Sequence, residues 1–154
     1  MHIVYLSLGT NLGYRRRNIR RAIEKIGEQI GVVVRQSALY ETEAWGYQSS
    51  HRFINAAICV ETMLSPHDLL AATQGIERQL GRSHKTKKKA DGHPAEGTDY
   101  QDRLIDIDIL LYDDIRVDDP DLQIPHPLMR EREFVMKPLQ EIMPEEDWAV
   151  ISSN

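Results

Sequence analysis

Residues 102–112 constrain the fold of this chain more than any other stretch. They read Asp-Arg-Leu-Ile-Asp-Ile-Asp-Ile-Leu-Leu-Tyr, and their β-branched and aliphatic residues with period-two alternation predict a buried β-strand. Successive side chains of a strand point to opposite faces, so Asp106 and Asp108 are expected together on one face. The opposite face is expected to be apolar and to carry Ile105, Ile107, Ile109 and Leu111.

The paired carboxylates of Asp106 and Asp108 need a physical reason. Side chains two residues apart on a strand lie about 7 Å from each other, and like charges at that distance repel. A divalent cation removes this cost, and oxygen ligands suit Mg²⁺, which commonly binds one or two carboxylates together with substrate phosphates. The simpler alternative is an edge strand whose acidic face is solvated.

Length, charge and cysteine content narrow the class of protein. A length of 154 residues suits one domain spanning residues 1–154. The formal net charge of −5 argues against a general polyanion binder, so no nucleic-acid partner is expected. Cys59 is the only cysteine, and its apolar neighbours favour a core residue over a nucleophile. The sequence shows neither a membrane-length apolar run nor a signal peptide, so we expect the cytoplasm and no membrane partner.

The hydrophobic patterns predict an α+β fold in the order β-α-β-β-α-β. This order is typical of a ferredoxin-like antiparallel sheet with helices on one face, which leaves the other face for a ligand. A helical C-terminal extension is expected over about residues 133–142, either continuous or broken near Pro138. The strands are expected at residues 2–8, 32–42, 53–62 and 102–112, and the two helices at residues 19–30 and 65–80.

Local signals mark the ends of these helices. Gly31 is expected to end the first helix, and Gly81 the second. Ser65 can cap the second helix, with Pro66 at its first position. The prolines between residues 120 and 127 indicate irregular chain before the last helix.

A basic run precedes the acidic strand. Residues 82–89 read Arg-Ser-His-Lys-Thr-Lys-Lys-Lys and are followed by a stretch rich in Gly, Asp, Thr and Pro. The run is either solvated surface or, as we favour, part of a mobile lid over about residues 83–102 that binds phosphate. Arg82, Lys85 and Arg103 would then meet the carboxylates, as phosphoryl transfer requires.

Taken together, these stretches resemble the 6-hydroxymethyl-7,8-dihydropterin pyrophosphokinase family of the folate pathway, from residue 3 to about residue 145. Each motif is weak alone, but their order is specific, and Arg-x-x-Asp-Ile-Asp-Ile at residues 103–109 is the most specific. The matching stretches are residues 8–13, 40–42, 53–57, 76–82, 102–110, 124–127 and 132–134.

The resemblance implies a reaction. The enzyme would transfer the β,γ-pyrophosphoryl group of ATP to the pterin hydroxyl and release AMP. Asp106 and Asp108 would hold two Mg²⁺ ions, and Arg82 and Arg103 would complete the catalytic set. Residues expected around ATP are Leu70, Gln74, Glu77, Arg82, Lys85, Arg103, Ile109, His126 and Arg132. Residues expected around the pterin are Thr42, Glu43, Ala44, Trp45, Phe53, Asn55, Asp106 and Phe134.

Strand parity supports part of this set, because Phe53 and Asn55 fall on one strand face. The alternative for either phenylalanine is a plain core residue. Parity places Arg103 opposite the aspartates, so its role requires the strand to begin after it or to twist there. The chain also departs from the family pattern: Glu43-Ala44 replaces a frequent Pro-Pro, and Tyr100-Gln101-Asp102 replaces Trp-Gly-Pro.

Two other functions are compatible with parts of the sequence. A polymerase-palm or cyclase-like enzyme would explain the aspartates, but not the set of Phe53, Asn55 and Phe134. A ferredoxin-like RNA-binding or regulatory module would present aromatic residues on a positive sheet face, whereas this face carries Asp106 and Asp108. The expected oligomeric state is a monomer.

Overall fold

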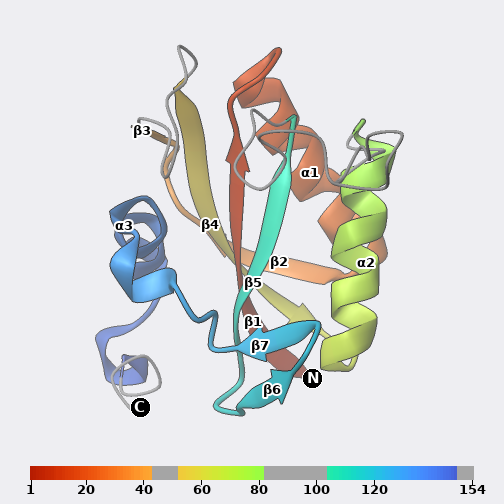
Figure 1. Ribbon diagram of the computed structural model, residues 1–154, viewed down its shortest axis with the longest axis vertical. Helices are drawn as coiled ribbons and strands as arrows, with labels where there is room; N and C mark the ends of the chain where they lie inside the picture. Colours follow the sequence, from red (N-terminus) through yellow and green to blue (C-terminus); the bar gives the residue numbers. More distant parts are fainter. Residues whose placement is uncertain (43–51, 82–103, 149–154) are drawn as a thin grey trace, which may run out of the picture.

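The computed structural model describes residues 1–42, 52–81 and 104–148. Its main sheet has the strand order β2-β4-β1-β5, with β3 also paired to β4, and all pairings are antiparallel (Figure 1). The predicted α+β class with an antiparallel sheet is therefore confirmed. The bounds of the strands are β1 His2–Thr10, β2 Gly31–Gln36, β3 Tyr40–Thr42, β4 Phe53–Thr62 and β5 Asp106–Tyr112.

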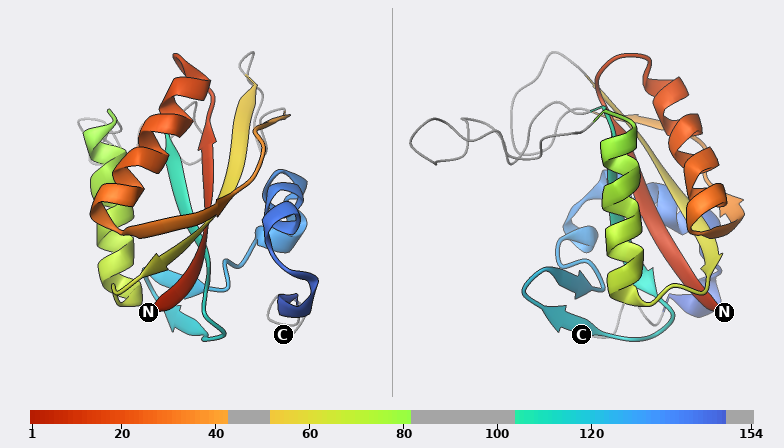
Figure 2. Two further views of the ribbon diagram at one scale, coloured as in Figure 1. Left: turned by 180° about the vertical axis from the view of Figure 1, so that it is seen from behind. Right: turned by 90° about the vertical axis from the view of Figure 1, so that its right-hand side faces the viewer.

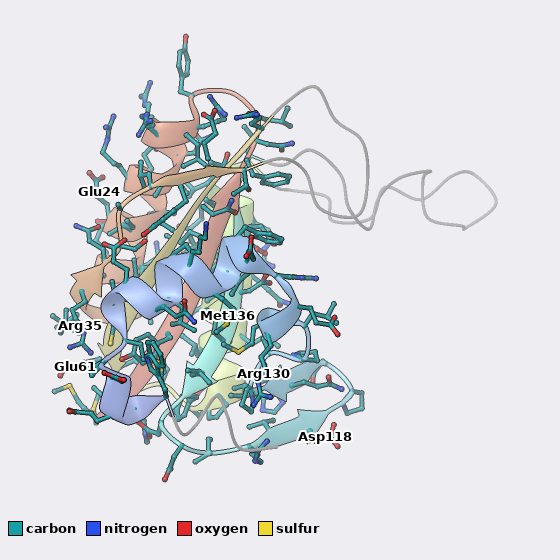
Figure 3. The ribbon with its side chains drawn as sticks, turned by 90° about the vertical axis from the view of Figure 1, so that its left-hand side faces the viewer. Glu24, Arg35, Glu61, Asp118, Arg130 and Met136 are labelled. Carbon is teal, nitrogen blue, oxygen red and sulfur yellow. The ribbon has the colours of Figure 1, made fainter. Side chains whose placement is uncertain are left out.

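Helices cover both faces of this sheet. On one face, α1 (Arg15–Gln29) and α2 (Pro66–Gln79) bury an apolar stripe that includes Ile26 and Ile76. On the other face lies α3 (Glu133–Ile142), as Figures 2 and 3 show. Our expectation that helices lie on one face and leave the other free is wrong in this respect, because the helical extension buries its own apolar stripe on that other face. The residues of that stripe, Val135, Leu139 and Ile142, pack with Tyr5, Ala57, Cys59 and Leu111.

A small hairpin follows the main sheet where irregular chain was expected. It consists of β6 (Val117–Asp119) and β7 (Leu122–Ile124), and is followed by the 3₁₀ turn η1 (Met129–Glu131). Leu122 and Ile124 are buried on either side of the exposed Gln123, which is the alternation of a strand with one covered face. The prolines therefore lie at the ends of two short strands and do not prevent strand formation here. A second 3₁₀ turn, η2 (Glu145–Asp147), follows α3.

The expected strand 32–42 is divided into β2 and β3. Its break lies at Ser37, whose backbone N–H donates to Ala57 O and whose Oγ accepts from Ala57 N, both at 2.9 Å. The side chain thus replaces a backbone group in the ladder, and the next amide, that of Ala38, donates to the Glu141 carboxylate of α3 at 3.0 Å. The register shifts by one residue between Gln36 and Tyr40 as a result.

A bulge in β5 changes the face of its last residues. Leu6 pairs with Ile109 but Tyr5 pairs with Leu111, so Leu110 is an extra residue in the ladder. Leu111 therefore packs under α3 and not on the isoleucine face, where simple alternation placed it. The positions of the two aspartates, before the bulge, are unaffected.

The helix ends agree with the local signals, with one exception. Ser65 Oγ accepts from Asp68 N at 3.2 Å, and Gly81 has a φ of +109° just after α2. Gly31, in contrast, is the first residue of β2, and a Cβ there would lie 2.0 Å from Glu61 O. It is required by close strand contact, not as a helix stop. Within the described ranges, no helix has the length and apolar character needed to cross a membrane.

Candidate active site

A cavity of about 310 Å³ lies along the outer edge of β5. One wall is α2, the opposite wall is the β6–β7 hairpin, and the segment after the hairpin closes the end. Most residues that the family resemblance placed around ATP or metal, and that the structure describes, line this cavity: Leu70, Gln74, Glu77, Asp106, Asp108, Ile109 and His126.

Two residues hold the walls against the edge of β5. This strand is last in the strand order, so one backbone edge is not paired with another strand of the main sheet. Glu77, which is 1% exposed, accepts a hydrogen bond from Ile107 N at 2.8 Å. His126 N donates to Leu110 O at 3.0 Å. Backbone groups alternate in direction along a strand, so Ile109 turns its N–H and C=O toward the same edge, between these two bonds.

His126 is held as a neutral donor. Burial lowers the pKa of its imidazole, the charge of Arg132 lowers it further, and Asp106 acts in the opposite direction. Nδ1 accepts a hydrogen bond from Leu128 N at 3.3 Å. A neutral imidazole that accepts at Nδ1 carries its proton on Nε2. His126 can therefore donate to an anion in the cavity without carrying a charge.

A second group of predicted residues shares one row across the sheet. Asp106 pairs with Gly9, Gly9 pairs with Asn55, and Asn55 pairs with Tyr40. Residues directly opposite in an antiparallel sheet project to the same face. Asn55 is 3% exposed, and its Nδ2 donates to Thr42 Oγ1 at 2.7 Å. The row lies on the same sheet face as α3, but toward the opposite end of the strands.

The two predicted aromatic residues lie on the side of the sheet that carries this row. Phe53 precedes Asn55 by two residues and therefore shares its face, while Phe134 lies in the first turn of α3, over the same side of the sheet. The guanidinium carbon of Arg132 lies 5.8 Å from the centre of the Phe134 ring. Both rings are partly exposed, so neither is a plain core residue.

Part of the predicted site lies outside the described residues. This part comprises Glu43, Ala44, Trp45, Arg82, Lys85 and Arg103, together with Tyr100 and the expected lid at residues 83–102.

The hairpin wall was missed by sequence reasoning. It brings Pro120, Asp121, Leu122 and Gln123 to the cavity. His67 Nε2, at the start of α2, lies 3.1 Å from an Asp119 carboxylate oxygen and 3.4 Å from one of Asp121, which links the two walls. The sequence does contain a signal for this hairpin, because Val-Asp-Asp and Leu-Gln-Ile flank a Pro-Asp turn in residues 117–124.

The fold and the site together define an α+β protein that presents paired carboxylates to a cavity, an arrangement that suits metal-dependent nucleotide chemistry. Residues 5–144 match the profile of the 7,8-dihydro-6-hydroxymethylpterin-pyrophosphokinase (HPPK) family. The chain belongs to this family.

Curated relatives agree with this assignment. A 2-amino-4-hydroxy-6-hydroxymethyldihydropteridine pyrophosphokinase of Porphyromonas gingivalis is 44% identical over 145 residues, which cover 94% of this chain and 92% of the relative. The Bacillus subtilis protein of the same name is 36% identical, with 92% of this chain and 78% of the relative covered. A mitochondrial folate synthesis bifunctional protein of Arabidopsis thaliana is 37% identical over 92% of this chain, which spans 24% of that protein.

Solved structures show the same fold. A Plasmodium falciparum HPPK-DHPS structure with pterin and p-hydroxybenzoate has a TM-score of 0.67 at 18% identity, with 94% of this chain covered. The chain spans 40% of that longer protein. At this identity the likeness concerns the fold alone.

Proposed function

We propose that this protein transfers the β,γ-pyrophosphoryl group of ATP to the hydroxyl of 6-hydroxymethyl-7,8-dihydropterin, giving the pterin diphosphate and AMP in folate biosynthesis. Membership of the HPPK family supports this reaction. The structural observation that carries it is the double position of Asp106, which lines the cavity beside β5 and also stands in one row with Gly9 and Asn55. A site for a nucleotide and a site for a heterocycle would thus meet at one carboxylate.

Asp106 and Asp108 are the proposed ligands of two Mg²⁺ ions. Both carboxylates are partly exposed and line the cavity, so they offer hard oxygen donors to a bound triphosphate. Asp106 and Asp108 lie two residues apart on one strand and carry like charges. A bound cation would relieve the repulsion between them. When bound, Mg²⁺ would neutralise phosphate charge.

The cavity supplies the proposed ATP site. Ile109 offers its backbone edge to an adenine, Leu70 adds apolar surface, and Gln74 lies one helical turn further along the same wall. The Nε2–H of His126 is suited to a phosphate oxygen, and Arg132 adds positive charge nearby. Glu77 acts mainly as a positioning residue, since its carboxylate holds the backbone of β5 at Ile107.

The pterin would lie over the row of Asn55 and Gly9. Phe53 and Phe134 are the aromatic residues that would stack on a flat ring, and Asn55 would bond its edge. Thr42 orients the Asn55 amide, because its Oγ1 accepts the hydrogen bond that Asn55 Nδ2 donates. Asp106, at the end of the row, would lie beside the substituent that carries the hydroxyl.

Other parts of the hypothesis stay proposals. We infer a ferredoxin-like architecture, which the order β2-β4-β1-β5 supports, and a single catalytic domain over residues 1–154. The roles of Arg82, Lys85 and Arg103 in phosphate binding are predictions, as are those of Glu43, Ala44 and Trp45 beside the pterin. The monomeric state and the cytoplasmic location are predictions as well.

Product analysis tests the reaction. The protein is incubated with Mg-ATP and 6-hydroxymethyl-7,8-dihydropterin, and AMP is measured together with the pterin diphosphate. We expect both products in equal amounts, and none without the pterin. Formation of ADP instead of AMP would contradict pyrophosphoryl transfer, and the absence of either product would contradict the proposed function.

A further inference from the structure

The backbone conformation at position 9 does not require a glycine. It lies within β1, where glycine weakens a strand. Among the described glycines, positive φ values occur at Gly13 and Gly81 but not at Gly9. Gly9 is also partly exposed between the buried Leu8 and Thr10. A residue with a side chain could adopt this conformation, so the missing side chain must matter for another reason.

The space over Gly9 belongs to the row that joins Asp106 to Asn55. A Cβ at this position would lie 3.1 Å from Asn55 Oδ1 and 3.8 Å from Phe53 Cδ1. The first distance is closer than ordinary van der Waals contact. Because Nδ2 of Asn55 donates to Thr42, the carbonyl oxygen Oδ1 is the atom of this buried amide that faces the space over Gly9.

The amide of Asn55 has little freedom to move away from an added methyl group. Its side chain is buried, and its hydrogen bond to Thr42 Oγ1 measures 2.7 Å. A methyl group on residue 9 would therefore both press on Oδ1 and occupy the space through which a ring reaches that acceptor.

We propose that Gly9 is a specificity-determining residue, whose missing side chain lets a flat heterocycle lie against the sheet and donate from its edge to Asn55 Oδ1. The inference rests on the proposed function and adds to it the residue that admits the ring. The chemical class selected is a planar ring with an N–H donor on the edge that faces Asn55. ATP, placed along the outer edge of β5, makes no use of this space.

Gly9→Ala tests the proposal, with Gly27→Ala as its matched control. Gly27 lies in α1, and a Cβ there meets nothing within 4 Å. Calorimetry measures first the affinity for a non-hydrolysable ATP analogue. It then measures the affinity for 6-hydroxymethylpterin with that analogue already bound. We expect Gly9→Ala to weaken pterin binding about tenfold or more while ATP-analogue affinity stays within about twofold. Gly27→Ala should change neither affinity.

Two further measurements connect the effect to Asn55 and to contact with the ring. In the double variant Gly9→Ala/Asn55→Ala, the second change should add little to the loss caused by Asn55→Ala alone, because both act on the same contact. In the wild-type protein, the amide resonance of Gly9 should shift when the pterin binds, whereas that of Gly27 should not. This last measurement stands even if Gly9→Ala does not fold.

The outcomes separate the two hypotheses. If the wild-type protein does not bind the pterin, the proposed function fails. If it binds the pterin and Gly9→Ala binds equally well, or loses ATP-analogue affinity to the same extent, the assignment of Gly9 is wrong while the proposed function stands. An unshifted Gly9 resonance in the pterin complex would also overturn the assignment.

Discussion

The two halves of the sheet face that carries α3 are built from the same three strands but have opposite characters. In the covered half, Tyr5, Cys59 and Leu111 pack under α3 and are almost fully buried. In the other half, the row of Asp106, Gly9 and Asn55 carries polar side chains and a glycine. β1 and β4 run from one half to the other in a constant register, and β5 does so with a bulge at Leu110. The difference between the halves therefore lies in side-chain choice together with this one bulge.

The covered half shows what burial does to a polar group. Burial raises the pKa of Tyr5 to about 12, so its hydroxyl stays neutral and accepts a hydrogen bond from Arg35 Nη2 at 3.1 Å. In the open half, Asp106 and Asp108 are only partly buried, which leaves room for a counter-ion. We propose that the covered half serves stability and that the open half gives up stability for binding.

The largest expected effect is on turnover, from Asp106→Asn or Asp108→Asn. Each change removes a proposed metal ligand, and we expect turnover to fall by about 10³-fold or more, which is about 4 kcal/mol of transition-state stabilisation. Thermal unfolding without metal should be unchanged or shifted upward, because the substitution relieves like-charge repulsion. Melting curves beside an AMP-release assay check both parts. Near-normal turnover in either variant would exclude that carboxylate from the mechanism.

The next effect is on stability, from Leu139→Ala in α3. Leu139 is 0% exposed in the covered half, so its truncation should cost about 2–5 kcal/mol of unfolding free energy. Leu139→Met, which conserves volume, should cost less than about 1.5 kcal/mol. Urea denaturation measures both, and calorimetry on the folded fraction should show an unchanged ATP-analogue affinity. A loss below about 1 kcal/mol for Leu139→Ala would mean that α3 is not an integral layer.

Pterin affinity should respond to changes in the open half. Asn55→Ala removes a buried hydrogen-bond partner and should cost about 1–3 kcal/mol of pterin binding. Phe134→Ala removes one stacking ring, worth about 0.5–1.5 kcal/mol beyond its buried area. ATP-analogue binding, titrated separately, should hardly change in either variant. An equal loss for both ligands would show that the pterin site has been placed wrongly.

The smallest expected effect concerns the pH dependence of folding at His126. Its folded pKa is lowered from 6.5, so the unfolded chain binds more protons in this range. His126 therefore costs no stability at neutral pH, but stability is lost as the pH falls through 6.5 toward the lower folded value. His126→Gln should show a shallower loss of unfolding free energy between about pH 7 and 5. The control variant is His2→Gln, which removes a histidine that pairs with Asp113 and does not line the cavity. Superimposable pH profiles of the His126 variant and the wild type would contradict this assignment.

Much of the local structure followed from sequence patterns. Sequence patterns predicted residues 53–62 with the bounds of β4, and a helix over about residues 133–142, which α3 spans without a break at Pro138. As expected, Ser65 caps the start of α2 and Gly81 follows its end. The pattern of residues 102–112 was also sufficient to place Asp106 and Asp108 on one face. These features depend on neighbours within a few residues along the chain, where side-chain spacing and turn chemistry act directly.

Tertiary structure decided the remainder, because it depends on contacts between residues far apart in sequence. The face of Leu111 follows from a bulge against β1, and the division of β2 from β3 follows from Ser37 bonding to β4. The place of α3 follows from the apolar surface that β1, β4 and β5 expose together. Only the register of three strands shows that Gly9 lies between Asp106 and Asn55. Sequence alone identified the candidate site residues, whereas packing determined which of them lie together.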